Sequence, residues 1–425
     1  MRPRTWVLLL AVVFALLQLA NVTGRDTPDS KNYVSYALSL GGASKREAAA
    51  ATIDWACSGD ASIARRNQSV NVNDFHGADP TRRVLQRCRT SEWGVVERRM
   101  AAGQTTGHTV PFMPARFMRI FEVRPGYPAF LLPFVTVLGV TWGVWLASVA
   151  VAVAGGILVF LILRTLSVSA PLALTGQALY YVLPCGTTAM RPMTEGLMLA
   201  LTLTAVWGCA LSLTGRPRPG TALVGGALLA LFTVKHSQSL FLGLCVAAAG
   251  TAVAVRRRRR GRVRGRGVVA VTAAGCCAAL GTVLLARLLH YPSETESLQD
   301  LLTGHFSRPD RAHPWAELLH LEGNFWLEWA RRQLRDPLFA VALAAGAWGA
   351  LRRPAFGTFL LAAAFTGILT QAGHPDINIW GERLIVLAWV LPVVGLPLLL
   401  EPVSLRGLAL PAQGHGERRD VRVTR

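Results

Sequence analysis

Charged residues are scarce in this sequence. Only 16% of its 425 residues are charged, against about 25% in soluble globular domains, whereas 52% are hydrophobic and the mean hydropathy is +0.37. Lysine is almost absent: three of the 44 basic residues are lysines, and the rest are arginines. The low charge argues against a soluble protein. Arginine in place of lysine, with abundant alanine, glycine and valine, is typical of a GC-rich bacterial genome.

The scarcity of charge leaves long hydrophobic runs. About 20 apolar residues cross the hydrocarbon core of a bilayer. The sequence therefore predicts an all-α, polytopic membrane helix bundle with about ten spans. The predicted spans are residues 6–20, 142–164, 168–189, 194–214, 219–235, 238–255, 267–289, 336–351, 356–371 and 383–400.

One further apolar run is too short to cross. Residues 129–140 would form a helix about 18 Å long, against a core of about 30 Å. We therefore predict a half-inserted helix there. Counting it as a full span would also put the arginine run at 256–260 on the outer face, against the rule that basic loops stay inside.

The net charge of +20 does not indicate nucleic-acid binding, because no polar domain carries it. The basic residues instead lie in short connectors between spans: Arg216 and Arg218, 256–266, Arg352 and Arg353, and 418–425. This pattern predicts a multi-pass protein of the cytoplasmic (inner) membrane with both termini in the cytoplasm. The first span is either a retained anchor or a signal peptide cleaved near Val22-Thr23-Gly24.

The predicted domain organisation is a single membrane domain over residues 1–404 with two long extracytoplasmic loops, 24–125 and 290–335. Trp315, Phe325, Trp326 and Trp329 predict a helix lying at the membrane interface in the second loop. The basic tail, 405–425, is predicted to be cytoplasmic and disordered.

The seven cysteines show no zinc-binding spacing. Five of them fall within predicted spans. The other two, Cys57 and Cys88, both fall in the first outer loop, where an oxidising compartment favours a disulfide between them.

Ionisable residues are nearly missing from span centres, which argues against a transport path across the bilayer. They gather at the outer ends of spans and predict a site at the outer membrane surface. The residues concerned are Asp26, Asp29, Arg191, Glu195, Lys235, His236, His374, Asp376, Glu382 and Arg383.

The sharpest local pattern follows the first span. Asp29-Ser30 precedes a segment with apolar residues at Tyr33, Ala37 and Leu40, the spacing of one helix face. On the simplest interpretation Asp29 caps this helix and has no other role.

The second interpretation rests on a resemblance. The Asp-Ser pair with Tyr, Ala, Leu and Gly after a first span resembles the opening of the C-class (GT-C) glycosyltransferases, which use polyprenyl-phosphate sugars. The 124–128 sequence, Arg-Pro-Gly-Tyr-Pro, is similar to an element that opens the next membrane helix in that family, and 191–195, Arg-Pro-Met-Thr-Glu, to a later arginine-proline-acid turn. The resemblance covers the order of elements through about residue 255. The sequence departs from the family in separating Asp26 from Asp29 by two residues.

The resemblance implies a membrane glycosyltransferase that moves a sugar from a polyprenyl phosphate to a hydroxyl of a cell-envelope glycan, glycolipid or protein. It implies Asp29 as the general base with Asp26 as its rival, and a sugar pocket shaped by Tyr127 and Glu195. The side chains expected to bind the donor phosphate are Arg124, Arg191, Lys235 and His236. No metal-ligand set stands out, although a divalent metal is not excluded. The competing hypothesis is a non-enzymatic protein, either a lipid or polysaccharide exporter or an inactive scaffold with this fold.

Overall fold

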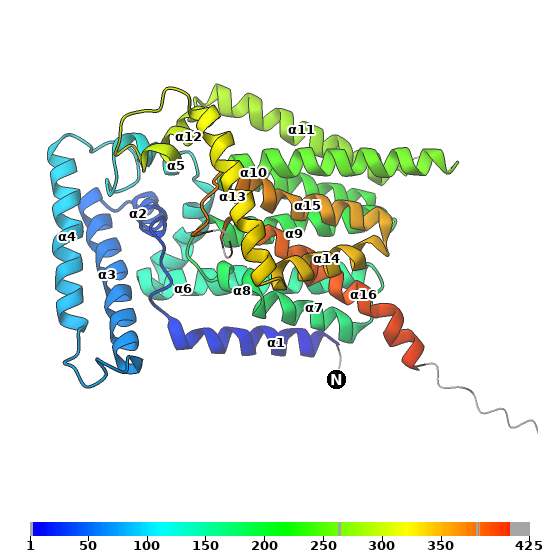
Figure 1. Cartoon of the computed structure of the whole chain (residues 1–425), viewed down its shortest axis with the longest axis horizontal. Coiled ribbons are helices and arrows are strands. Elements are labelled where there is room, and N and C mark those ends of the chain that lie inside the picture. Colours follow the sequence, from blue (N-terminus) through cyan, green and yellow to red (C-terminus); the bar gives the residue numbers. More distant parts are fainter. Residues whose placement is uncertain (1–2, 262–264, 380, 382, 409–425) are drawn as a thin grey trace, which may run out of the picture.

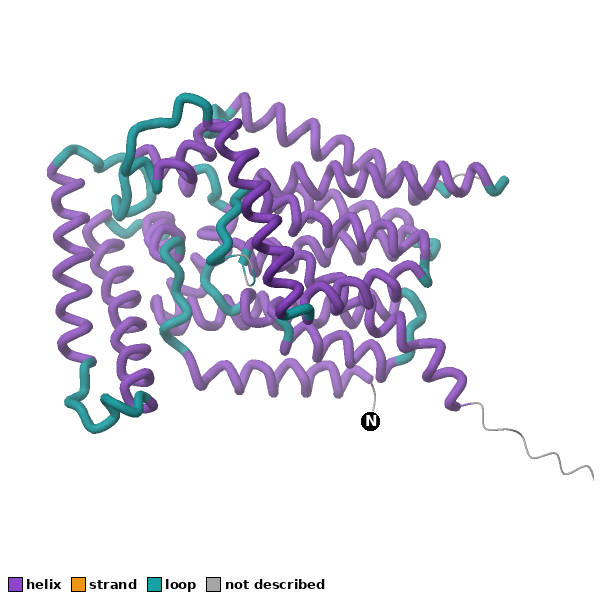
Figure 2. Tube along the Cα trace, viewed as in Figure 1, coloured by secondary structure: helices purple, strands orange, loops and turns teal. Residues whose placement is uncertain are grey.

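The structure, a computed structural model, describes residues 3–261, 265–379, 381 and 383–408, with backbone only from 402. Throughout the described residues the regular structure is helical, and they contain no β-strand; Figure 2 shows the same in colour. The all-α prediction is confirmed to that extent.

The helices of the first half of the chain are, in order, α1 (Pro3–Gln18), η1 (Leu19–Asn21), α2 (Ser30–Leu40), α3 (Lys45–Val70), α4 (Thr81–Ala101), α5 (Ala115–Glu122), α6 (Gly126–Thr165), α7 (Ala170–Val182), α8 (Pro184–Ala189) and α9 (Thr194–Leu213). The helices of the second half are α10 (Pro217–Arg259), α11 (Arg266–Leu288), α12 (Glu294–Thr303), α13 (Pro314–Arg335), α14 (Leu338–Leu351), α15 (Pro354–Ala372), η2 (Leu384–Trp389) and α16 (Val390–Leu408).

The helices form a bundle with a helical head at one end. In Figure 1 the bundle helices run roughly parallel to one another, while α3 and α4 lie across one end of the bundle, with α4 outermost. We call this end the loop end. The opposite end, where α10 finishes in Arg256–Arg259, is called the arginine end. The connector at Arg352 and Arg353 lies there as well.

Seven of the described helices are long and apolar enough to cross a membrane, or up to eight if α13 and α14 form one broken span. The axes of α13 and α14 meet at 90°. Several apolar helices of this length make the chain a multi-pass membrane protein.

The long helix α10 reverses direction at Lys235, where the sequence predicts a turn between two spans. Lys235 has φ −160° and ψ 92°, outside the helical region. The Ser239 hydroxyl donates a hydrogen bond to the Leu228 carbonyl at 2.8 Å. In an uninterrupted helix these residues would lie about 16 Å apart, so the two halves of α10 pack side by side as a hairpin.

A second reversal divides α6. Gly139 has φ +71°, a left-handed conformation that glycine adopts without steric cost. A Cβ on Gly143 would lie 2.5 Å from the Phe134 carbonyl oxygen, so the segment before Gly139 folds back on the one after it. The short run that the sequence predicts as non-spanning is therefore one arm of a hairpin, beginning at Gly126.

Two predicted spans differ from the helices observed. Residues 168–189 are not one helix: the chain is extended at Leu183, between α7 and α8, because Pro184 follows it. The predicted span 336–351 is α14, which is only 14 residues long and about 21 Å by itself.

The α16 helix runs past the predicted span end at residue 400 and reaches Leu408, four residues into the predicted tail. Residues 409–425 lie outside the described residues.

The first loop is a helical head made of α2–α5. Tyr33 and Ala37 on α2 are buried as predicted, but Leu40 is 36% exposed because α2 ends there. Tyr33, Phe117 and Tyr127 belong to one apolar cluster with bundle residues such as Met193. This cluster fixes the head on the loop end of the bundle.

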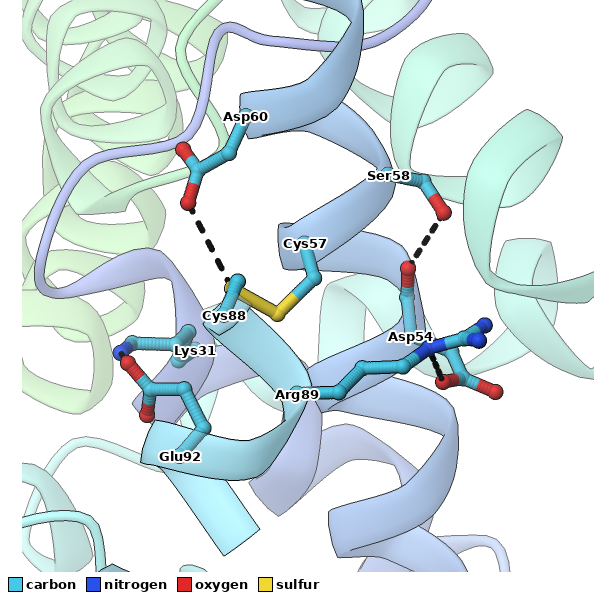
Figure 3. Close-up of a disulfide and its surroundings, with 8 residues drawn as sticks. All are labelled: Lys31, Asp54, Cys57, Ser58, Asp60, Cys88, Arg89 and Glu92. Atoms are coloured by element: carbon cyan, nitrogen blue, oxygen red, sulfur yellow. Dashed lines mark hydrogen bonds and ion pairs between the residues drawn. A yellow bond between two sulfur atoms is a disulfide. The ribbon is translucent and has the colours of Figure 1, made fainter. Parts of the chain in front are cut away.

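A disulfide joins α3 to α4 in the head. Cys57 and Cys88, the pair that the sequence predicts, have Cα atoms 5.6 Å apart (Figure 3). The Arg89–Asp54 ion pair, at 2.8 Å, flanks the bond. Cys57 itself is fully buried between the helices.

We predict that replacing Cys57 and Cys88 with serine loosens the α3–α4 hairpin. The bond closes a chain segment with a sequence separation of 31 residues, and a loop of that size contributes about 3–4 kcal/mol in the chain-entropy account. Chymotrypsin should cut after Phe75, in the 71–80 connection, at least about tenfold faster in the double variant. Cys276→Ser, at an exposed free cysteine of α11, is the control. Unchanged electrophoretic mobility of the wild type on reduction would contradict the disulfide.

Candidate functional site

A buried carboxylate lies at the centre of the loop end. Glu195, in the first turn of α9, is only 2% exposed. The Arg383 Nε donates to its Oε1 at 3.4 Å, and the Lys235 Nζ lies 3.9 Å from the same oxygen. The Thr194 hydroxyl donates to Oε2 at 3.1 Å. Glu195 thus ties the start of α9 to the reversal of α10 and to the segment before η2.

Asp29 belongs to the same network through Arg383. The Arg383 guanidinium forms an ion pair with the Asp29 carboxylate while its Nε reaches Glu195. Asp29 stands at the position before α2, but its side chain does not cap that helix. Its φ of −78° and ψ of −24° are helical, whereas a capping residue is usually extended. The sequence interpretation of Asp29 as a simple cap is therefore wrong.

Arg124, Tyr127 and Tyr33 pack beside this network. The rings of Tyr33 and Tyr127 meet edge to face with centroids 5.3 Å apart. Burial raises the pKa of the Tyr33 phenol, and the nearby Arg124 guanidinium opposes that shift. Arg124 Nε is buried without a hydrogen-bond partner among the described residues.

His236 follows Lys235 at the reversal of α10. Its ring lies 5.2 Å from that of Tyr291, between centroids. Its Nδ1, like Arg124 Nε, is buried with no hydrogen-bond partner in the described chain. A buried donor without an acceptor, as at Arg124 Nε, is the arrangement that an incoming anion or water satisfies.

A cavity of about 970 Å³ opens next to the network. It lies where α1 ends, since Gln18 lines it, and it is walled by the 24–28 segment, by the start of the α8–α9 turn and by the segment before η2. The lining residues are Gln18, Gly24, Arg25, Asp26, Thr27, Pro28, Thr187, Arg191, Arg332, Ile377, Asn378, Ile379, Gly381 and Arg383.

Asp26 is the only carboxylate among the described residues of this lining, which also contains four arginines. Arg383 is paired with Asp29 and Glu195, and Arg332 with Glu328, but each guanidinium has five N–H donors, and guanidinium binds phosphate oxygens in bidentate fashion. Arg332, from α13, also donates to the Ile377 carbonyl at 3.4 Å and so joins the second loop to the cavity wall.

The environment of Asp26 favours its protonated form. Burial raises the pKa of Asp26, its own backbone N–H opposes the shift, and the Asp60 carboxylate adds to it. Because folding raises this pKa, the stabilising contribution of Asp26 is fully present below the unfolded pKa and is lost as the pH rises through the folded pKa. At neutral pH an ionised Asp26 therefore costs folding free energy.

The structure brings the sequence-predicted residues together in two groups. Asp29, Glu195 and Lys235 share one ion-pair network, with Arg124, Tyr127 and His236 beside it. Asp26 and Arg191 line the cavity instead. Glu382 lies outside the described residues.

Sequence reasoning missed two functional candidates. It noted Arg383 only as one of several ionisable residues at span ends, and it gave Arg332 no role. Arg383 pairs with Asp29 across 354 residues of sequence, and no local sequence motif predicts a partner that distant. Within the described part of the chain, no three His, Cys, Asp or Glu side chains are grouped to hold a metal ion.

We predict that Asp29→Asn lowers the thermal stability of the protein. The substitution removes one member of a pair whose side chains are each 22% exposed, leaving Arg383 with Glu195. A partly buried pair of this kind is worth about 1–3 kcal/mol. Asp54→Asn, at the more exposed pair with Arg89, should have little effect. Equal unfolding temperatures for Asp29→Asn and the wild type in detergent would show that the pair does not support the fold.

Comparisons with family models, with curated proteins and with solved structures find no match to this chain.

Proposed function

We propose that this protein is a membrane glycosyltransferase of the GT-C type. It transfers a sugar from a polyprenyl phosphate to an acceptor hydroxyl at the outer face of the cytoplasmic membrane. One observation carries the proposal: the loop-end cavity combines a carboxylate, Asp26, with four arginines at the point where α1 ends. A lipid-linked donor anchored in the bilayer would present its phosphate and sugar at that level.

The proposed orientation follows from charge and from the disulfide. Basic connectors lie at the arginine end, which we assign to the cytoplasm with both chain termini. The loop end with the Cys57–Cys88 bond is then extracytoplasmic, in an oxidising compartment. We propose ten crossings: the seven apolar helices, the second half of α10, the broken α7–α8 pair and the broken α13–α14 pair.

In the proposed reaction, an oxygen of the acceptor forms a bond to the anomeric carbon of the sugar. The bond between that carbon and the donor phosphate oxygen breaks, and the electron pair leaves with the polyprenyl phosphate. The acceptor proton passes to a carboxylate, which must lie within about 3 Å of the hydroxyl. A raised pKa makes a carboxylate a stronger base, provided that it is ionised at the working pH.

The cavity supports Asp26 rather than Asp29 as that base. Asp26 lines the cavity, and no cation of the described residues lies within ion-pair distance of its carboxylate. The Asp29 carboxylate is engaged by Arg383. We assign Asp29 and Glu195 to holding the Arg383 guanidinium at the cavity wall.

The arginines of the cavity are assigned to the donor phosphate. Arg191, Arg332 and Arg383 enter it from three different parts of the chain, so they would surround a phosphate and stabilise the charge that develops as it leaves. Arg124, Lys235 and His236, which the sequence also suggests as phosphate ligands, lie behind this wall around Glu195. We assign Arg124 and Lys235 to the positive potential beneath the site, and His236 no charge in it.

The alternative is an exporter or an inactive scaffold of the same fold. An exporter built from repeats should show broken helices at matching positions of two halves. The helices break at Gly139, Leu183 and Lys235, but the sequence shows no repeat that would place these breaks at matching positions of two halves. We prefer the enzyme because the loop-end cavity combines a carboxylate with several guanidinium groups, the two kinds of group that the transfer needs.

We predict that Asp26→Asn abolishes sugar transfer without loss of stability. The amide cannot accept the proton, so transfer should fall by about 10²–10⁴-fold. The unfolding temperature should be unchanged or higher, because a carboxylate that is costly to ionise has been removed. The assay supplies membranes with radiolabelled polyprenyl-phosphate mannose or arabinose, with Asp54→Asn as the control.

The results of this assay distinguish between the two candidate bases and between an enzyme and a non-enzymatic protein. Full activity of Asp26→Asn with loss in Asp29→Asn would keep the enzyme class and move the base to Asp29. Wild-type transfer at the empty-vector level with every donor would favour the exporter or the scaffold.

A further inference from the structure

A second cavity lies at the opposite end of the bundle from the candidate site. It has a volume of about 500 Å³ and is lined by Pro3 and Arg4 from α1 and by Phe160 and Arg164 from α6. The two helices run antiparallel: the Trp145 indole donates to the Gln18 carbonyl at 3.2 Å at the loop end. The first turn of α1 and the last turn of α6 therefore meet at the arginine end.

The charge of this cavity is unbalanced. Its described lining contains two ionisable side chains, both arginines, and no carboxylate. Two guanidinium groups that share one cavity repel each other. Arg164 donates to the Val168 carbonyl, which occupies one of its five N–H donors and leaves others available. An anion between the two arginines would relieve the repulsion and accept these donors.

The surroundings of the cavity are apolar. Phe160 forms its buried wall, and α1 beside it presents an exposed hydrophobic face that includes Leu8, 61% exposed, and Val12, 53% exposed. Only 17% of the apolar window of α1 is buried within the protein, the smallest share of the seven candidate spans. In a membrane that face contacts acyl chains, so an occupant with an anionic head and an apolar tail fits both parts of the site.

We propose that this cavity binds the phosphodiester head group of an anionic glycerophospholipid. The phosphate lies between Arg4 and Arg164, and the acyl chains run along α1 over Phe160. Basic pockets between membrane helices bind anionic head groups in this way. The competing account is that both arginines only extend to the head groups of the bulk bilayer, without selecting among lipids. This inference does not depend on the proposed enzymatic function.

Native mass spectrometry of the full chain in detergent tests the proposal, with dioleoyl phosphatidylglycerol and dioleoyl phosphatidylcholine titrated separately. The wild type should bind phosphatidylglycerol at least about tenfold more tightly than phosphatidylcholine, since one charge-assisted contact corresponds to about that factor. Arg4→Gln with Arg164→Gln should abolish this preference. Arg216→Gln with Arg218→Gln removes the same charge at exposed connector positions and should leave it intact.

Three results would overturn the proposal: equal binding of the two lipids by the wild type, equal losses in the two double variants, or a site occupied by inorganic phosphate in preference to phosphatidylglycerol. The charge-conserving Arg4→Lys with Arg164→Lys variant should retain most of the preference. If the glutamine variant does not fold, the lipid preference of the wild type and of the lysine variant decides.

Discussion

The loop end of the molecule depends on one buried carboxylate. Glu195 begins α9 inside an apolar bundle, where an unpaired charge would cost several kcal/mol. Its partners, Arg383 and Lys235, come from the segment before η2 and from the reversal of α10. Arg383 in turn holds Asp29 at the start of α2. One charge therefore requires four distant parts of the chain to meet, and the cavity forms where they do.

The cost of placing a charge in an apolar environment also determines where polar groups lie in the rest of the structure. A bilayer penalises charge at mid-depth, so ionisable groups collect at the two ends of the bundle. The ends differ in composition. At the arginine end the connectors are mostly basic, whereas at the loop end acids and bases are paired in a folded head. That asymmetry underlies both proposals, a donor-phosphate site at the loop end and a lipid head-group site at the arginine end.

Much of the fold could be predicted from the sequence, because helix length and apolar character are local properties. The reversal at Lys235 and the short arm before Gly139 both follow from counting residues against bilayer thickness. The break before Pro184 was not predicted, because the apolar run continues through it. The local signal was present all the same, since the residue before a proline disfavours helix.

The candidate site could be predicted only in part. Charged residues at the ends of spans were recognisable, yet which of them meet is decided by packing between helices far apart in sequence. Asp29 looked like a helix cap because its neighbours fit a cap, and only the approach of Arg383 gives its carboxylate a different partner. Asp26 and Asp29, three residues apart, have different environments because one faces the cavity and the other faces Arg383.

Photo-crosslinking measures the central claim most directly, that the loop-end cavity holds a lipid-linked phosphate. A polyprenyl phosphate carrying a diazirine next to its phosphate would be activated in membranes, and the modified peptides mapped by mass spectrometry. The account predicts adducts on peptides that contain 24–28, Arg191 or 377–383, suppressed by excess unlabelled polyprenyl phosphate. Adducts confined to the arginine end, or spread evenly over the lipid-facing helices, would contradict it.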